Sequence, residues 1–147
     1  MQANWLILMT LIAGALMPLQ AGINGQLAAQ LSSTLAAALI SFLVGTLLLL
    51  VLTWAAREFP TLGALRALQP WHWVGGLMGA FFIATAALAG PRLGALLFMT
   101  LILAGQLSMA LLLDHQGWVG FREAPISWGK IGGLLLIVAG VVLIRRG

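Results

Sequence analysis

The sequence predicts an all-α membrane protein, and three observations support this prediction. Hydrophobic residues occupy 62% of the 147 positions and charged residues only 7%, whereas charged residues make up about 25% of a soluble domain. The mean hydropathy is +1.09. Five stretches are apolar over the roughly 20 residues that a membrane-spanning helix needs. We therefore expect five transmembrane helices in a single domain covering residues 1–147.

The charged and polar residues exclude several classes of protein. The sequence contains seven Lys and Arg residues and three acidic residues. These charged residues lie mostly between the apolar stretches rather than in one patch. This spacing favours lipid headgroups as partners and argues against nucleic acid. The chain has no Cys and only two isolated His, so no metal site and no cofactor are expected. No nucleophile with a base and no paired carboxylates are present, so an enzyme is not expected.

The first predicted helix covers residues 5–28 and carries polar side chains that lipid would not favour. Gln20 and Asn24 are four residues apart, so they share one helical face at about 40° from each other. Pro18 frees a backbone carbonyl, and Gly22 allows close packing. We expect Gln20 and Asn24 to contact a substrate, and Pro18 and Gly22 to allow bending and packing. Alternatively, the amides hydrogen-bond between helices and only hold the bundle together.

The second predicted helix covers residues 35–56. Ala37, Ser41 and Gly45 recur every four residues along it, and such a stripe of small residues lets another helix approach closely. Ser41 is the strongly polar side chain in the middle of this helix, so it is a candidate substrate contact. Alternatively, its hydroxyl bonds back to a carbonyl of its own helix.

The third predicted helix covers residues 71–89 and begins with aromatic residues suited to a membrane interface. Three glycines follow, and we expect them to form a flexible or closely packed stretch: Gly75, Gly76 and Gly79. The segment Gly90-Pro91-Arg92 predicts a tight break. So short a connection would make the third and fourth helices an antiparallel hairpin.

The fourth predicted helix covers residues 93–113, and the fifth covers residues 128–144. Gln106 lies deep in the fourth helix and is a further candidate substrate contact. Asp114 ends this helix and is a candidate for proton coupling. Alternatively, Asp114 is a solvated helix end that pairs with His115 or Arg92.

The positive charges are divided almost evenly between the two sides of the membrane, so they favour neither orientation strongly. Five spans place four Lys and Arg on one side and three on the other, and an excess on the cytoplasmic side normally sets the orientation. The first group is Arg57, Arg66, Arg122 and Lys130, and the second is Arg92, Arg145 and Arg146. We therefore expect insertion in both orientations. Many transporters consist of two inverted repeats, so a five-span chain is expected to pair with an inverted copy of itself.

Several segments together resemble the YdcZ-like group of the drug/metabolite transporter superfamily. They are 13–25, 41–46, 73–82, 91–94, 104–107, 111–115 and the glycine-rich ending 133–144. The resemblance implies one five-helix repeat, half of the superfamily's ten-helix form, in a bacterial-type plasma (inner) membrane. It implies a transporter lineage without supplying a substrate. Small multidrug exporters of this superfamily carry a glutamate in the first helix, and the first helix here has no acid, so their proton-coupled cation export is not expected.

The function predicted from these features is transport of a small molecule by an antiparallel homodimer. The first-helix amides of both copies would line a cavity with alternating access. Uncharged amides both donate and accept hydrogen bonds, so they suit a small neutral, zwitterionic or weakly polar metabolite. Two alternatives remain open. The chain could be half of an obligate heterodimer with an oppositely oriented paralogue, or a membrane helper protein that transports nothing.

Overall fold

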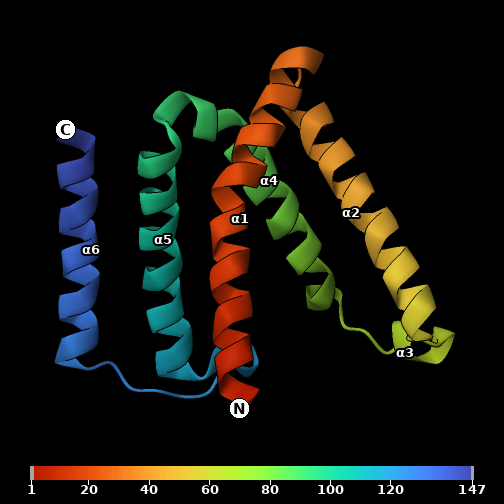
Figure 1. The fold of residues 1–147 in the computed structure, drawn as a ribbon. Helices are drawn as coiled ribbons and strands as arrows, with labels where there is room; N and C mark the ends of the chain where they lie inside the picture. The colour runs from red at the N-terminus through yellow and green to blue at the C-terminus, as the bar shows by residue number, and fades with distance from the viewer. Residues whose placement is uncertain (1, 147) are drawn as a thin grey trace. The chain divides into compact units, whose positions relative to one another are not determined.

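The computed structural model describes residues 2–146, and within this range every regular element is a helix. The prediction of an all-α protein with five membrane spans is confirmed, because five helices of the described chain are long and apolar enough to cross a bilayer. The long helices are α1 (Gln2–Leu31), α2 (Thr34–Ala56), α4 (Val74–Leu93), α5 (Ala95–Gln116) and α6 (Trp128–Arg146) (Figure 1). Short helices in the connections are α3 (Leu62–Arg66), η1 (Pro70–Trp73) and η2 (Trp118–Gly120).

Most of the buried apolar side chains in this protein are small, and most of the large apolar side chains are exposed. The buried apolar residues are Ala21, Ala37, Ala38, Ile83, Ala86, Ala87 and Phe98. Most Leu and Trp side chains lie on the surface. A soluble protein buries its large apolar residues, whereas helices in a bilayer pack through small residues and turn large ones to lipid. The distribution of side chains is therefore that of a membrane bundle.

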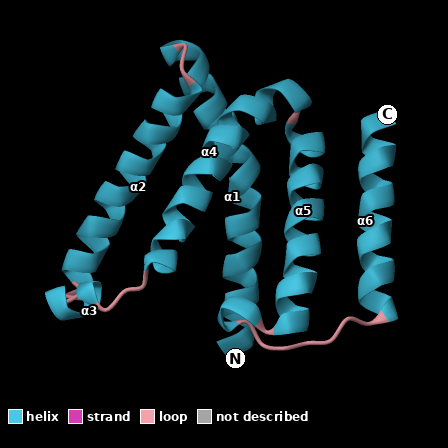
Figure 2. Cartoon of the chain, turned by 180° about the vertical axis from the view of Figure 1, so that it is seen from behind, coloured by secondary structure: helices cyan, strands magenta, loops and turns pink. Residues whose placement is uncertain are grey.

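The chain divides into two compact units, residues 1–92 and residues 93–147. In the first unit, α1 and α2 form an antiparallel helical hairpin (Figure 2). Ser32 adopts a left-handed conformation with φ of 50° between the two helices. The Ser33 hydroxyl then accepts a hydrogen bond from the Ala36 amide at 3.2 Å, which caps the start of α2. Ala37, the first residue of the predicted stripe, is completely buried.

Helix α4 packs on both α1 and α2 within the first unit. Gly79 of α4 lies beside the Phe42 ring of α2, and a Cβ added at Gly79 would lie 3.3 Å from that ring. Gly25 of α1 lies against Pro91 and Ala87 of α4. Glycines therefore lie at these two contacts, because a helix without a Cβ at the contact can come nearer to its neighbour.

The predicted break at Gly90-Pro91-Arg92 is wrong, because α4 continues through Pro91 to Leu93. A proline removes one hydrogen bond from the helix, and at Pro91 this loss falls within the last turn, where the helix can still finish. The break lies at Gly94, whose φ of 79° and ψ of 151° favour glycine. The Gly94 carbonyl accepts from the Phe98 amide at 3.0 Å and begins α5.

The second unit consists of α5 and α6, which run antiparallel, with η2 in their connection (Figure 1). Gly117 ends α5 in a left-handed conformation. The Ala124 amide donates to the Asp114 carbonyl at 2.7 Å. The Lys130 ammonium of α6 donates to the carbonyls of Ala124 at 3.0 Å and Pro125 at 3.1 Å. Ala124 and Pro125 thus link this connection to the helices on either side of it.

Candidate functional site

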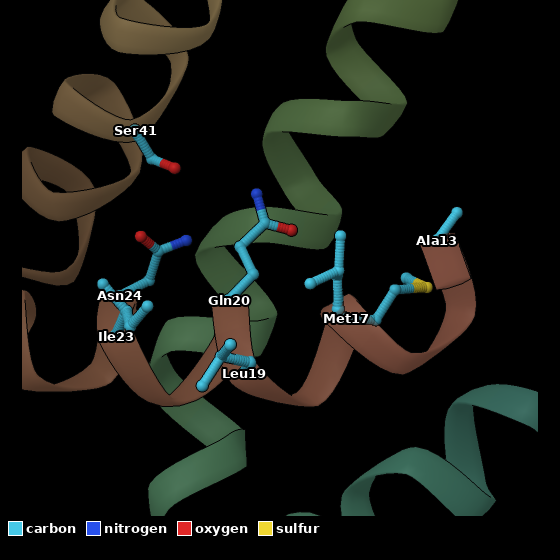
Figure 3. Close-up of a pocket in the computed structure, with 8 residues that line it drawn as sticks. Ala13, Met17, Leu19, Gln20, Ile23, Asn24 and Ser41 are labelled. Carbon is cyan, nitrogen blue, oxygen red and sulfur yellow. The ribbon is translucent and has the colours of Figure 1, made fainter. Parts of the chain in front are cut away.

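Three of the four predicted substrate contacts lie together in the first unit. Gln20 and Asn24 project from the same side of α1, and Ser41 faces them from α2 (Figure 3). They line a cavity of about 460 Å³. The rest of its wall is apolar and comes from Ala13, Leu16, Met17, Leu19 and Ile23. The helical spacing of the two amides thus predicts a shared face, and the packing of α2 adds the hydroxyl.

Asn24 is the most informative residue of this cavity. The residue is only 4% exposed, and its Nδ2 atom is buried with no hydrogen-bond partner among the described residues. An unpaired buried amide typically costs about 1–3 kcal/mol, so this arrangement destabilises the isolated chain. An amide that held two helices together would be paired. The structure therefore gives no support, within the described residues, to Asn24 as an interhelical link.

Ser41 of α2 is half-buried and lines the cavity together with the two amides of α1. Other hydroxyls in the protein bond back to their own helices, as Thr10 does to the Leu6 carbonyl and Ser108 to the Ala104 carbonyl, both at 2.8 Å. Within the described residues, the Ser41 hydroxyl makes no bond of this kind. The oxygen and hydrogen of Ser41 are therefore available to the cavity.

A second, smaller cavity adjoins the first. It has a volume of about 230 Å³ and shares Gln20 and Ser41 with the larger one. Its other lining residues come from α2 and α4, and they are Phe42, Gly45, Thr46, Leu49 and Ile83. Gln20 and Ser41 therefore lie between a larger space that Asn24 lines and a smaller space that Phe42, Leu49 and Ile83 line. The contribution of Ile83 depends on how α4 packs, and no sequence pattern indicates it.

The five residues predicted to bend or pack differ in their surroundings. Pro18 is half-buried inside an uninterrupted α1. Gly79 packs against Phe42, whereas Cβ atoms at Gly22, Gly75 or Gly76 would meet no described residue within 4 Å. Gly25, rather than Gly22, is the close contact of α1. Gly25 follows Gly22 by three residues, close to one turn of α1, and this spacing is the signal that could have identified it.

In the second unit, Asp114 and Gln106 occupy different surroundings. Asp114 is half-buried and lines a cavity of about 290 Å³ between α5 and α6 together with Lys130. The remaining lining residues are Leu107, Ala110, Leu111, Gly133, Leu134 and Ile137. Gln106 is exposed on α5 and does not line this cavity. Lys130 shares a cavity with Asp114 because one residue ends α5 and the other begins α6.

Two comparisons with other proteins found no match, and a third found a family. The family described as "Putative inner membrane exporter, YdcZ" matches residues 5–143, which is nearly the whole chain. No curated protein and no solved structure matches. Among the described residues, no three His, Cys, Asp or Glu lie close enough together to hold a metal ion.

Proposed function

The chain belongs to the YdcZ family of inner membrane exporters, and from this premise we propose that the cavity between α1 and α2 is the substrate site of a small-molecule transporter. Membership makes the protein a multi-pass inner membrane transporter, which is not a class of enzyme. The observation that carries the site assignment is the buried, unpaired Nδ2 of Asn24. A donor kept buried at a cost in stability is explained when a bound molecule supplies its acceptor.

The proposed cycle moves a small uncharged or zwitterionic metabolite through this cavity by alternating access. Gln20, Asn24 and Ser41 make the polar contacts, since amides and hydroxyls donate and accept hydrogen bonds without attracting a net charge. Pro18 supplies a point where α1 can bend. The stretch from Gly75 to Gly79 supplies a second such point, because two of its three glycines have open space around them. Gln106 and Asp114 remain proposed contributors, as a substrate contact and a proton-coupling carboxylate.

The proposal includes an antiparallel homodimer. Gln20 is exposed on the single chain although it lies in the middle of a membrane-spanning helix. An amide turned to lipid lacks hydrogen-bond partners, so a second copy that covers this face would bring Gln20 into a shared polar cavity. The four-to-three division of Lys and Arg supports pairing in opposite orientations, because it favours neither orientation.

Orientation in the membrane tests the dimer directly. The chain, expressed alone, carries at its C-terminus either a reporter active only in the cytoplasm or one active only outside it. We expect signal from both reporters. Arg92→Ala leaves four positive charges against two and should shift the signal toward the orientation in which Arg57 and Arg66 are cytoplasmic. Signal from one reporter alone would contradict the homodimer and favour a heterodimer with an oppositely oriented paralogue.

Export by living cells tests the site for any substrate that can be measured in the medium. Cells that express the wild type, Gln20→Ala, Asn24→Ala or Gln30→Ala are compared by mass spectrometry of the compounds they release. For each compound that the wild type exports, we expect the amount in the medium to fall at least tenfold in cells with Gln20→Ala or Asn24→Ala. Gln30→Ala is the matched control, since Gln30 is an exposed amide at the end of the same helix and outside the cavity.

The alternative of a helper protein makes the opposite prediction for the same variants. A protein whose helices serve only association would keep its function when the cavity amides are removed. It would lose assembly when a contact glycine is enlarged. Unchanged release from cells with Gln20→Ala and Asn24→Ala, at equal protein abundance, would therefore exclude the proposed substrate site.

A further inference from the structure

We infer that the substrate is a neutral amphipathic molecule, with a carbonyl or hydroxyl oxygen that accepts a hydrogen bond from Asn24 and a short apolar portion that enters the adjoining cavity. This inference rests on the proposed function and narrows its substrate class. It follows from the two cavities that meet at Gln20 and Ser41. The expected ligand therefore has two chemically different ends.

The polar end is set by Asn24. Among the described residues, the buried atom without a partner is Nδ2, which is a donor, and a ligand oxygen reaches it when the Asn24 amide turns toward the cavity. A donor is satisfied by an acceptor oxygen, whereas an ammonium group has only donors and cannot satisfy it. Gln20 and Ser41 lie within the same cavity and can both donate and accept (Figure 3). They can therefore bond the remaining polar atoms of the same group on the ligand.

The preference for a neutral ligand follows from the residues that line the two cavities. Among the described residues that line either cavity, none is Asp, Glu, Lys, Arg or His. A charged ligand buried among apolar and amide side chains would lose its hydration without gaining an opposite charge. A carbonyl or hydroxyl group loses much less hydration free energy than a charged group, and it regains hydrogen bonds from the amides. The walls thus favour a neutral group over both an anion and a cation.

The apolar end is set by the second cavity. Its lining includes the apolar side chains of Phe42, Leu49 and Ile83, together with Gly45 and the hydroxyl-bearing Thr46. Among the described residues, a Cβ built at Gly45 would meet nothing within 4 Å. The space beyond Gln20 and Ser41 therefore fits a chain of a few carbon atoms that packs against Phe42, Leu49 and Ile83.

The asparagine content of the chain makes a sharp experiment possible. Asn4 and Asn24 are its two asparagines, and Asn4 is exposed near the start of α1. Protein labelled with ¹⁵N at asparagine alone, purified in detergent, therefore shows two side-chain amide signals, and Asn24→Leu assigns them. The probes are hexanamide, hexylammonium and hexanoate, which have the same chain length and differ in the polar group. Acetamide is a fourth probe, without the apolar portion.

We expect hexanamide to shift the Asn24 signal in a saturable way and to leave the Asn4 signal in place. Hexylammonium and hexanoate should bind at least tenfold more weakly, and so should acetamide. Gly45→Leu fills the second cavity and should reduce hexanamide affinity at least tenfold, without changing that of acetamide. Val44→Leu is the matched control, because Val44 is exposed on α2 and lines neither cavity.

The outcomes separate this inference from the proposed function. Preferential binding of hexylammonium or hexanoate at Asn24 would overturn the neutral class and leave the substrate site standing. Equal affinity of hexanamide for the wild type and Gly45→Leu would overturn the apolar half of the inference. If no probe shifts Asn24 more than Asn4, the inference is overturned. Export that still depends on Gln20 and Asn24 would then leave the transporter assignment intact.

Discussion

Replacing Asn24 with Leu is expected to abolish transport and to stabilise the protein at the same time. Leu has the same branching as Asn and no polar atoms, so it removes the unpaired Nδ2 from a position that is only 4% exposed. The gain should approach the cost of a buried unpaired amide, about 1–3 kcal/mol. Thermal unfolding of purified protein in detergent measures the stability. Release of the exported compounds measures transport.

The same variant distinguishes a binding residue from a structural one. If Asn24 held helices together, Asn24→Leu would lower the melting temperature. Its loss of transport would then follow from the loss of stability and would not indicate substrate binding. Asn4→Leu is the matched control, because Asn4 is exposed and outside the cavity. It should leave both properties near those of the wild type. A melting temperature of Asn24→Leu below that of Asn4→Leu would contradict the proposed role of Asn24.

Gly25→Ala should disrupt the packing of α1 against α4, whereas Gly22→Ala should not. A Cβ at Gly25 would overlap the Pro91 ring and lie 3.6 Å from the Ala87 carbonyl oxygen. Overpacking of this kind typically costs about 1–3 kcal/mol. Gly22 lies one turn earlier on the same helix with nothing within 4 Å. There, Ala should be neutral or stabilising, by up to about 1 kcal/mol, through its higher helix propensity.

Thermal unfolding of the two variants side by side tests this contact. Equal melting temperatures would mean that α1 and α4 do not approach at Gly25. A fall with Gly25→Ala should also reduce export, because Asn24 is the neighbouring residue and depends on the same part of α1 for its position. Gly22→Ala and Gly25→Ala gain the same helix propensity, so a lower melting temperature of Gly25→Ala than of Gly22→Ala comes from packing.

The fold was largely predictable because a bilayer simplifies the problem. Every backbone polar group must be satisfied within its own segment, so a long apolar stretch becomes a helix. The five expected helices are all present. The prediction at Gly90-Pro91-Arg92 is wrong because proline and glycine both favour a break without fixing its position. The helix tolerates Pro91 near its end, and the conformation that breaks it, with φ of 79°, occurs at Gly94.

The candidate site was predictable only in part. The shared face of Gln20 and Asn24 follows from their spacing along one helix. That Asn24 is buried while Gln20 is exposed does not follow from spacing, because it depends on where α2 and α4 cover α1. The second cavity likewise depends on Ile83, which lies 59 positions after Asn24 in the chain.

The amino-acid sequence is sufficient to predict an all-α membrane protein with five spans and two amides on one face of its first helix. These properties depend on composition and on the local period of the helix, which neighbouring residues set. Helix packing, in contrast, leaves Asn24 without a hydrogen-bond partner among the described residues, makes Gly25 rather than Gly22 a helix contact, and joins two cavities at Gln20 and Ser41. These properties depend on contacts between segments far apart in the chain, and no local pattern encodes them.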